Sequence, residues 1–515
     1  MRPASGNLGD LLHEAVTFTP HKLAVIGKHE QLTYKELDER IKRAGNVFKS
    51  LGIVKGDRVA LLFPNDVSFI EICFGLMRIG AVPVPLNIKL SIEVLSYILT
   101  DSGAKLVVYK ESLLDKAQRL QTGDGPCFIQ AGGHHQENTY EDLREKASTE
   151  LETVHVEDDD LCFLPYTSGS TGKPKGCMLT HHGQWWNAYT TAKCYLLDRE
   201  DRALVAVPLY HKNAMINAVK PCLMVGASIV IRPDFDPEDV IASIDQYKCT
   251  YTTGVPAMFK MILAAYQSLT HYDVSSLQFI VCGSSEVPIE LLEALKRTFD
   301  IKIMEAYGLT EGGPQVFATP RWGTHKQGSS GLPIPGCEVQ IVDLDKNQEL
   351  PANEIGELWV KNPGVVKGYW NRPELTDVKF KGGWLKTGDL AYLDEDGYGY
   401  IIGRTDDMIN IGGENAYPKE IEQVLLKHDA VEDVCVIRTK HSVKGEAPVA
   451  FIKKVQGYEA TTEEEIKRFF IENGPAYAHP RLVFFINEMP LGGTGKIDKG
   501  QLKNLLNEHN TRRIP

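Results

Sequence analysis

A loop rich in glycine and hydroxyl side chains follows a short apolar run between residues 161 and 183, LCFLPYTSGSTGKPKGCMLTHHG. Backbone N–H groups and hydroxyls of such a loop can bind phosphate oxygens at little steric cost, and Lys175 adds a positive charge. The spacing is not that of a Walker loop, because two residues separate Gly169 from Gly172 and Pro174 follows Lys173. The loop is therefore a candidate phosphate site of another type, with a plain turn as the alternative.

A second candidate lies in EAYGLTEGGP, residues 305 to 314. An acidic side chain directly after the Tyr-Gly-Leu-Thr turn can hold Mg²⁺ through Glu311, since this ion prefers a carboxylate together with phosphate oxygens. A solvated glutamate in a loop at a strand end is the alternative interpretation.

Three further residues suit the recognition of a nucleotide. Asp389, in the Thr-Gly-Asp turn of GWLKTGDL, can accept hydrogen bonds from both ribose hydroxyls, and Arg404 can donate to the same sugar. Lys496 lies on a second glycine loop, PLGGTGKID. Taken singly, the three also read as a turn carboxylate, a surface ion pair and a solvated lysine.

The elements that position these residues alternate between short apolar strands and amphipathic helices. DRVALLF precedes SFIEICFGLMRIGAV, and LQFIVCG precedes PIELLEALKRTF, a pattern that predicts parallel sheets covered by helices. Residues 330–403 carry short alternating strands and Gly-, Pro- and Asp-rich turns, which indicate a small β unit. The predicted fold class is α/β, with a large N-terminal domain at 1–404 and a small α+β domain at 405–515.

Composition excludes several classes of protein. The chain of 515 residues is 43% hydrophobic and 24% charged, as ordinary globular proteins are, and its net charge of −12 argues against nucleic acid as a partner. Its ten cysteines include no C-x-x-C pair, which suits reduced thiols rather than a zinc site. The N-terminus lacks the apolar core of a signal peptide, and no run reaches the ~18 apolar residues of a membrane span. We expect a cytoplasmic protein.

In order and approximate spacing, these motifs together resemble the adenylate-forming superfamily, which includes acyl-CoA synthetases, adenylation domains of peptide synthetases and beetle luciferases. The segment YTSGSTGKPKG is similar to the signature loop of the family, and YGLTE, TGD, GR and the terminal GK follow. The resemblance covers nearly the whole chain. It implies a loop that clasps the β- and γ-phosphates of ATP while a carboxylate attacks the α-phosphate and pyrophosphate leaves.

The resemblance assigns a nucleotide site residue by residue. It places in the phosphate loop Thr167, Ser168, Gly169, Ser170, Thr171, Gly172 and Lys175. It places along the adenine Gly283, Ser284, Ser285, Glu305, Ala306 and Tyr307, although many relatives have Gly-Ala-Pro at the first three positions. Thr310 would bind the α-phosphate, Glu311 and Thr167 the magnesium, and Asp389 and Arg404 the ribose.

The same resemblance makes Lys496 the catalytic residue, supported by Thr310 and Glu311. An ammonium between the attacking carboxylate and the α-phosphate relieves the repulsion of two anions, and the carboxylate needs no general base because it is ionised at neutral pH. The small domain must then be mobile, with Asp406 in GRTDD as its pivot. Gly412 and Gly413 match the segment beside the CoA pantetheine tunnel, although the next residues are not basic as in many relatives.

The segment VPLYHKNAM matches one wall of the acyl pocket, with His211 beside the carboxylate and Asn213 and Met215 beyond it. Gly254 would belong to a facing wall. Relatives specific for acetate tend to carry Trp at the position of Gly308, so its absence implies a deeper pocket for a medium-chain, branched or aromatic acid. A histidine satisfied by backbone and a methionine packed in the core are the alternatives for His211 and Met215.

The expected function is that of an AMP-forming acid–CoA ligase that uses ATP, CoA and Mg²⁺, as a monomer or homodimer. A stand-alone enzyme that loads a separate carrier protein is the alternative within the family. A binding protein without catalysis is a rival class, and the joint presence of Lys496, Glu311 and Asp389 argues against it. The loop spacing excludes a P-loop kinase.

Overall fold

The computed structural model describes residues 2–121, 123, 125–132, 138–167, 173–283, 287–411, 414–441, 444–491 and 497–513, with side chains as far as 508. The chain divides into two compact units. The first comprises residues 1–339, 359–387 and 397–399, and the second 340–358, 388–396 and 400–515. The expected domain boundary between residues 404 and 405 stays a prediction, because a division of the chain by packing does not show where one domain would rotate against the other.

The larger sheet of the first unit has nine strands and is parallel from β1 to β15, with antiparallel strands at both edges. Its strands in spatial order are β17 (Leu332–Pro333), β16 (Phe317–Ala318), β15 (Lys302–Tyr307), β14 (Phe279–Gly283), β13 (Tyr251–Gly254), β11 (Arg202–Val205), β12 (Ser228–Ile231), β1 (Leu23–Ile26) and β2 (Gln31–Thr33). The carboxyl ends of β14 and β15 therefore lie side by side.

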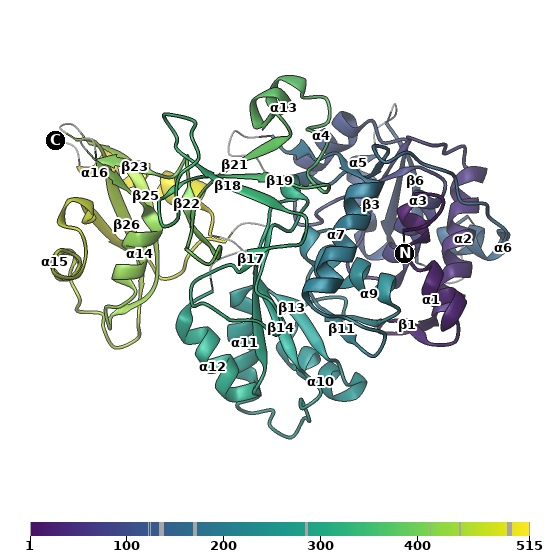
Figure 1. The fold of residues 1–515 in the computed structure, drawn as a ribbon, viewed down its shortest axis with the longest axis horizontal. Coiled ribbons are helices and arrows are strands. Elements are labelled where there is room, and N and C mark those ends of the chain that lie inside the picture. Colours follow the sequence, from purple (N-terminus) through teal and green to yellow (C-terminus); the bar gives the residue numbers. More distant parts are fainter. Residues whose placement is uncertain are drawn as a thin grey trace. The chain divides into compact units, whose positions relative to one another are not determined.

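A second, fully parallel sheet belongs to the same unit. Its order is β4 (Val82–Pro85), β3 (Arg58–Leu62), β5 (Leu106–Lys110) and β6 (Cys127–Ala131). Helices cover both faces of each sheet, as parallel sheets require. Figure 1 shows α10 (Pro237–Tyr247), α11 (Pro256–Tyr266) and α12 (Ile289–Phe299) gathered beside β13 and β14, where they share one apolar cluster with the large sheet.

The largest apolar cluster lies between the two sheets and is continuous with both. Four helices contribute most of its remaining side chains: α2 (Tyr34–Ser50), α3 (Val67–Arg78), α7 (His181–Cys194) and α9 (Lys220–Val225). The outer face of the smaller sheet packs on α4 (Ile92–Ser102) and α5 (Leu114–Leu120). Short elements complete this unit: α1 (His13–Phe18), α6 (Tyr140–Lys146) and α13 (Pro373–Lys379).

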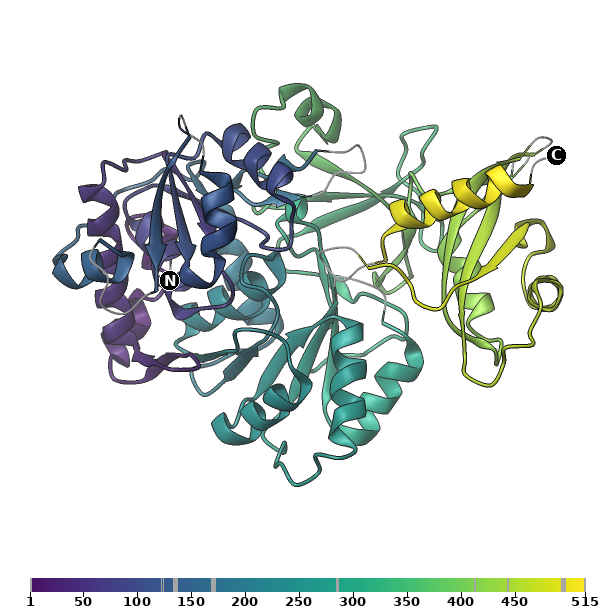
Figure 2. The same ribbon diagram turned by 180° about the vertical axis from the view of Figure 1, so that it is seen from behind.

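A five-stranded sheet continues the chain, and the division between the units falls within it. Its strands are β18 (Glu338–Val342), β19 (Gly356–Lys361), β20 (Phe380–Lys381), β21 (Trp384–Leu393) and β22 (Gly399–Arg404). The last sheet comprises β23 (Ile409–Ile411), β24 (Glu414–Ala416), β25 (Val431–His441), β26 (Gly445–Lys454) and β27 (Leu482–Phe485). Helices α14 (Pro418–Leu425) and α15 (Glu463–Asn473) pack on one of its faces. Helix α16 (Lys499–Arg513) packs beside β25 through Leu502 and Leu506 (Figure 2).

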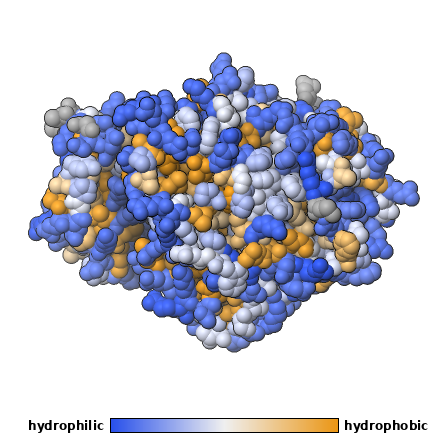
Figure 3. All heavy atoms as spheres, in the orientation of Figure 1, coloured by the Kyte–Doolittle hydropathy of each residue, from blue (hydrophilic) through white to orange (hydrophobic). Residues whose placement is uncertain are grey.

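The predicted fold class is confirmed: a large α/β region with a small β unit is followed by a small α+β region. No helix among the described residues is both long and apolar enough to cross a bilayer. Hydrophilic residues cover most of the face shown in Figure 3, with smaller apolar areas between them.

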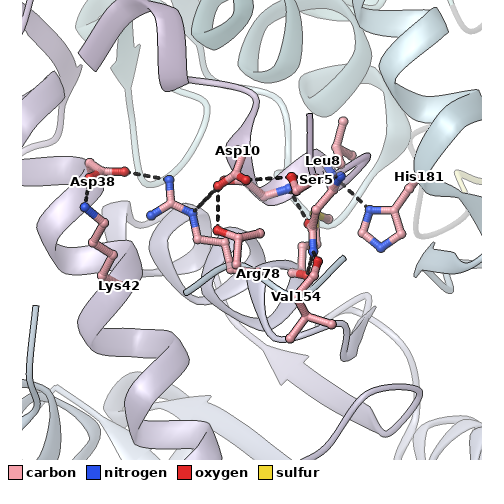
Figure 4. A network of polar contacts seen from close by, with 12 residues as sticks. Ser5, Leu8, Asp10, Asp38, Lys42, Arg78, Val154 and His181 are labelled. Carbon is pink, nitrogen blue, oxygen red and sulfur yellow. Dashed lines mark hydrogen bonds and ion pairs between the residues drawn. The ribbon is translucent and has the colours of Figure 1, made fainter. Parts of the chain in front are cut away.

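A buried polar network joins the N-terminal segment to α2, α3 and α7 (Figure 4). Arg78 of α3 pairs with Asp38 at 2.5 Å and with Asp10 at 3.1 Å. Next to it, the Leu8 N–H donates to Nδ1 of His181 at 3.0 Å, and His181 is the first residue of α7. The network thus orients α7, the helix that begins where the glycine-rich segment ends.

His181 predicts a pH dependence of stability. Burial lowers the pKa of this histidine from 6.5 to about 3, against the effect of Asp160, so the folded protein keeps it neutral while the unfolded chain binds a proton below pH 6.5. Stability therefore falls as the pH drops from 6.5 towards 4, by up to about 1.4 kcal/mol per pH unit. In thermal unfolding between pH 7 and 5, His181→Asn, which can still accept from Leu8, should show a shallower loss of Tm than wild type. Equal slopes would contradict this assignment.

Candidate active site

The two ends of the candidate phosphate loop lie side by side. Strand β8 (Tyr166–Thr167) follows β7 (Leu161–Phe163) and pairs antiparallel with β9 (Lys175–Gly176), with Thr167 opposite Lys175. Ser168, Gly169, Ser170, Thr171 and Gly172 lie outside the described residues, so their assignment stays a prediction. The hairpin places Thr167 and Lys175, the first and last residues of the predicted phosphate loop, opposite each other.

Thr167 and Glu311, proposed from sequence as metal ligands, meet in the structure. Thr167 Oγ1 donates to Glu311 Oε1 at 3.3 Å, across 144 positions of sequence. Glu311 stands in the 3₁₀ turn η4 (Thr310–Gly312), directly after β15, and Thr310 beside it is buried. Tyr369, which sequence analysis missed, donates its hydroxyl to the same carboxylate oxygen at 3.1 Å, and the Lys175 ammonium lies 5.5 Å from its ring centroid.

The oxygen atoms gathered here suit magnesium. Mg²⁺ typically takes one or two protein carboxylates and completes its shell with water and substrate phosphates. Glu311 supplies the carboxylate and Thr167 a hydroxyl. Within the described part of the chain no cluster of three or more His, Cys, Asp or Glu side chains is placed to hold a metal ion.

A carboxylate behind the loop anchors its first strand. Tyr166 donates its hydroxyl to Asp101 Oδ2 at 2.8 Å, and Arg372 donates to Oδ1 of the same residue at 2.8 Å. Tyr97 donates to this Oδ1 at 3.3 Å, and the Trp370 indole to the Asp101 carbonyl at 3.0 Å. Asp101 therefore joins the end of α4, strand β8 and the segment that follows Tyr369. No sequence pattern marked Asp101.

The predicted adenine slot is assembled at the adjacent ends of β14 and β15. Gly283 pairs with Ala306 in the parallel register, and a Cβ at Gly283 would lie 2.7 Å from the Ala306 carbonyl oxygen. Glu305 and Tyr307 flank Ala306, and the Tyr307 ring contacts Phe317 at a centroid distance of 6.0 Å. Ser284 and Ser285 lie outside the described residues. The close backbones explain why a glycine ends β14.

The predicted ribose residues meet in the second unit. Arg404 donates to Asp389 Oδ1 at 2.8 Å and to the predicted hinge residue Asp406 at 3.3 Å. Burial opposes the charge of Arg404, but the two carboxylates raise its pKa above the ordinary value. The expected Thr-Gly-Asp turn is instead part of strand β21, in which Gly388 has a φ of +75° that a glycine adopts without strain. The Gly388 N–H donates to Glu357 at 2.9 Å.

A small cavity of about 20 Å³ lies beside the adenine slot, which is room for about one water. Its lining residues are Lys212, Asn213, Ile216, Asn217, Val281, Gly283, Ala306, Tyr307, Gly308, Pro314 and Gln315. Two of the predicted acyl-pocket residues, Asn213 and Gly308, belong to this lining. Sequence analysis missed Asn217 and Gln315, which no motif marks.

The other predicted acyl residues lie apart from this lining. Met215 is 5% exposed and packs in the largest apolar cluster, as its alternative interpretation holds. His211 caps α8 (Lys212–Ala214), where its Nδ1 accepts the Asn213 N–H at 3.4 Å. Gly254 ends β13 against the ring of Phe259, which a Cβ would approach to 3.1 Å. Their roles towards an acid stay predictions.

The structure gives Gly308 a reason other than pocket depth. A Cβ at this position would lie 2.0 Å from the Pro314 carbonyl oxygen and 2.9 Å from Gln315 Cα. No side chain fits beside this backbone, so the absence of a tryptophan does not by itself indicate a deep pocket.

Three predicted residues, Lys496, Gly412 and Gly413, lie outside the described residues. On either side of the lysine loop, Leu491 and Ile497 form an isolated antiparallel bridge, and the Asp498 N–H donates to the Pro490 carbonyl at 2.8 Å. The flanks of the loop are thus held together. The roles of the three residues stay predictions.

Comparisons with known proteins agree with this geometry. The model of the AMP-binding enzyme family matches residues 12–370, and that of the AMP-binding enzyme C-terminal domain matches 420–496. A feruloyl-CoA synthase of Amycolatopsis sp. is 35% identical over 94% of this chain and 96% of its own. A 2-succinylbenzoate–CoA ligase of Geobacillus sp. is 32% identical over 96% and 97%. The crystal structure of an anthranilate CoA ligase with anthranoyl-AMP is 28% identical, covers 98% of both chains and superposes with a TM-score of 0.90.

The chain belongs to the AMP-binding enzyme family, and within it to the AMP-forming acid–CoA ligases of the adenylate-forming superfamily. The motif resemblance read from the sequence is confirmed at this level.

Substitution of Asp101 should weaken ATP use through Tyr166. Asp101→Asn removes the charge that accepts from Tyr166 and Arg372, so we expect the KM for ATP to rise about tenfold with little change in kcat. Pyrophosphate exchange at varied ATP measures both constants. Because the residues act through one contact, the double variant with Tyr166→Phe should be no worse than the poorer single variant. Additive losses, or a loss in kcat alone, would refute the positioning role.

Substitution of Glu311 should lower the rate of the adenylation reaction itself. Glu311→Gln keeps the shape and an acceptor for Thr167 and Tyr369 but removes the charge, so we expect the rate of pyrophosphate exchange to fall about 100-fold at saturating ATP. The requirement for Mg²⁺ should shift to higher concentration in a titration. Glu338→Gln, a change at an exposed carboxylate paired with Lys361, serves as the control. An unchanged Mg²⁺ titration would remove Glu311 from the metal site.

Proposed function

We propose that this ligase activates a medium-chain, branched or aromatic carboxylic acid with ATP, forming an acyl adenylate and pyrophosphate, and then transfers the acyl group to CoA. The contact between Thr167 and Glu311 carries the proposal, because it joins the phosphate hairpin to the end of the adenine-bearing strand. Three relatives carry feruloyl-CoA, succinylbenzoate and anthranoyl-AMP in their names, which supports an aromatic acid among these classes.

In this proposal each group of residues has a separate task. The backbone at Gly283 and Ala306 holds the adenine, and Asp389 with Arg404 holds the ribose. Glu311 and Thr167 would hold Mg²⁺, which when bound supplies charge neutralisation at the leaving pyrophosphate. Lys175 adds positive charge near the phosphates. Asn213 and the backbone of Gly308 border the space next to the α-phosphate, where the acid would lie.

Lys496 would provide the ammonium that neutralises the attacking carboxylate and the α-phosphate oxygens as charge develops on phosphorus. The Arg404 guanidinium donates both to Asp389, the predicted ribose ligand, and to Asp406, the predicted hinge residue. This shared contact supports a pivot at Asp406. Movement about Asp406 would bring Lys496 to the site for the first half-reaction and withdraw it for the second.

Exchange of labelled pyrophosphate into ATP, run with a panel of carboxylic acids, tests the adenylation step directly. Fatty acids of graded length, branched acids and substituted benzoates and cinnamates should separate the classes. Acids that support exchange should also yield thioester and AMP when CoA is added. Lack of exchange with every acid, or ADP as the product, would overturn the proposal.

Lys496→Ala should separate the two half-reactions. Adenylation should fall about 100-fold or more, because one preorganised charge is lost from the transition state. Thioester formation from supplied acyl-AMP and CoA should be nearly unchanged, because the lysine acts in the first step alone. Lys503→Ala, at an exposed lysine on α16, is the control near the same loop. Equal losses in both half-reactions would contradict the division of labour.

A further inference from the structure

A buried lysine stands in the largest apolar cluster with neutral partners. Lys220, the first residue of α9, is 3% exposed, and its ammonium donates to Gln184 Oε1 at 2.6 Å and to Asn187 Oδ1 at 2.9 Å, both on α7. Among the residues that the structure describes, no carboxylate lies within ion-pair distance of it. Buried charges in proteins are ordinarily paired, because removal from water is costly.

The amide groups around Lys220 include N–H donors that have no acceptor. An ammonium has only donors, so it fixes the amide oxygens of Gln184 and Asn187 towards itself. Gln184 Nε2 and Asn187 Nδ2 are buried and have no hydrogen-bond partner, and these residues are 4% and 0% exposed. An acceptor with negative charge would satisfy these two amide donors and the ammonium together.

From Lys220, Gln184 and Asn187, further polar side chains continue along α7 and the turn before α9 to the cavity that borders the adenine slot. We call this row of side chains the polar strip. One helical turn before Lys220, Asn217 lines the cavity and accepts the Tyr195 hydroxyl at 2.7 Å. One turn after Asn187, Thr191 donates at 2.8 Å to Gln315, which also lines the cavity. The strip thus runs between α7 and the π-helical turn η3 (Met215–Val219) into α9.

The two ends of the polar strip differ in whether their polar atoms have hydrogen-bond partners. Around the cavity the polar side chains bond to one another: Gln315 donates to Tyr195 at 3.0 Å, Asn217 to Asn213 at 3.3 Å, and Thr253 to Asn213 at 2.6 Å. At Lys220 the polar strip ends in unpaired donors. Burial also lowers the pKa of Lys220 from 10.5 to about 7, so a neighbouring anion would restore its full charge.

From this arrangement we infer that the acid substrate carries a second carboxylate, which pairs with the Lys220 ammonium and accepts from the free amide groups of Gln184 and Asn187. The inference rests on the proposed function and narrows its substrate class to acids with an anionic remote end. Lys220 then determines specificity, since an acid ending in a methyl group would leave the ammonium unpaired. The acyl carboxylate itself stays beside the α-phosphate.

Paired acids test this directly with the wild-type enzyme. Each pair differs only in a terminal methyl group replaced by a carboxylate: butanoate and succinate, pentanoate and glutarate, hexanoate and adipate, 4-methylbenzoate and terephthalate. In acid-dependent pyrophosphate exchange, at least one diacid should exceed its partner in kcat/KM by roughly 100-fold. Preference for the methyl-terminated acid in every pair would overturn the inference.

Lys220→Met, which keeps the length and removes the charge, should abolish that preference. We expect the KM for the preferred diacid to rise roughly 100-fold while kcat/KM for its methyl-terminated partner is retained or improved. Lys193→Met, the same change at an exposed lysine on α7, is the control and should alter neither value. An equal loss for both members of the pair would show a structural role and refute the inference.

The outcomes separate this inference from the proposed function. If methyl-terminated acids support exchange and no diacid is preferred, the ligase activity is supported and the specificity role of Lys220 is refuted. If no acid supports exchange, the proposed function itself fails. Should Lys220→Met not fold, judged by its melting temperature, the wild-type comparison of paired acids still decides. Lys220→Met leaves the buried amide oxygens of Gln184 and Asn187 without their donor, so its melting temperature should fall below that of the wild type.

Discussion

The hydrogen bond between Thr167 and Glu311 is the constraint on which the candidate site depends. It joins two segments 144 residues apart, and Tyr369 adds a third segment 58 residues further on. A single ion placed among these oxygens would touch the hairpin that precedes α7 and the turn that ends β15. The acid and ATP are both anions, so a site that gathers them needs its few positive charges and oxygen ligands held in fixed relation.

Much of this arrangement was predictable from sequence, because local patterns encode it. Strand and helix alternation predicts parallel sheets, and parallel sheets bring the ends of β14 and β15 to one edge, where Gly283 and Ala306 pair. The short motifs then supply Thr167, Glu311, Asp389 and Arg404, and the structure brings together the two pairs that were expected to act together.

The rest depends on packing between remote segments. Asp101, Tyr369 and Gln315 stand in stretches of ordinary composition, and each acquires its role only where the chain returns to it. Gly308 illustrates the opposite case: its residue type was predicted to matter, but the physical reason is the backbone at Pro314 and Gln315 rather than space for an acyl chain. Lys220 lacks any motif, and its significance comes from burial without a counter-ion.

Crowding at Gly308 also limits how the substrate range of such an enzyme can be altered in the laboratory. Any side chain there collides with main-chain atoms, which cannot rotate away as a side chain does. A larger residue at position 308 of this chain would require the backbone at Pro314 and Gln315 to move. Ile216 and Val281, which line the same small cavity, offer volume that can be enlarged or reduced without a change at Gly308.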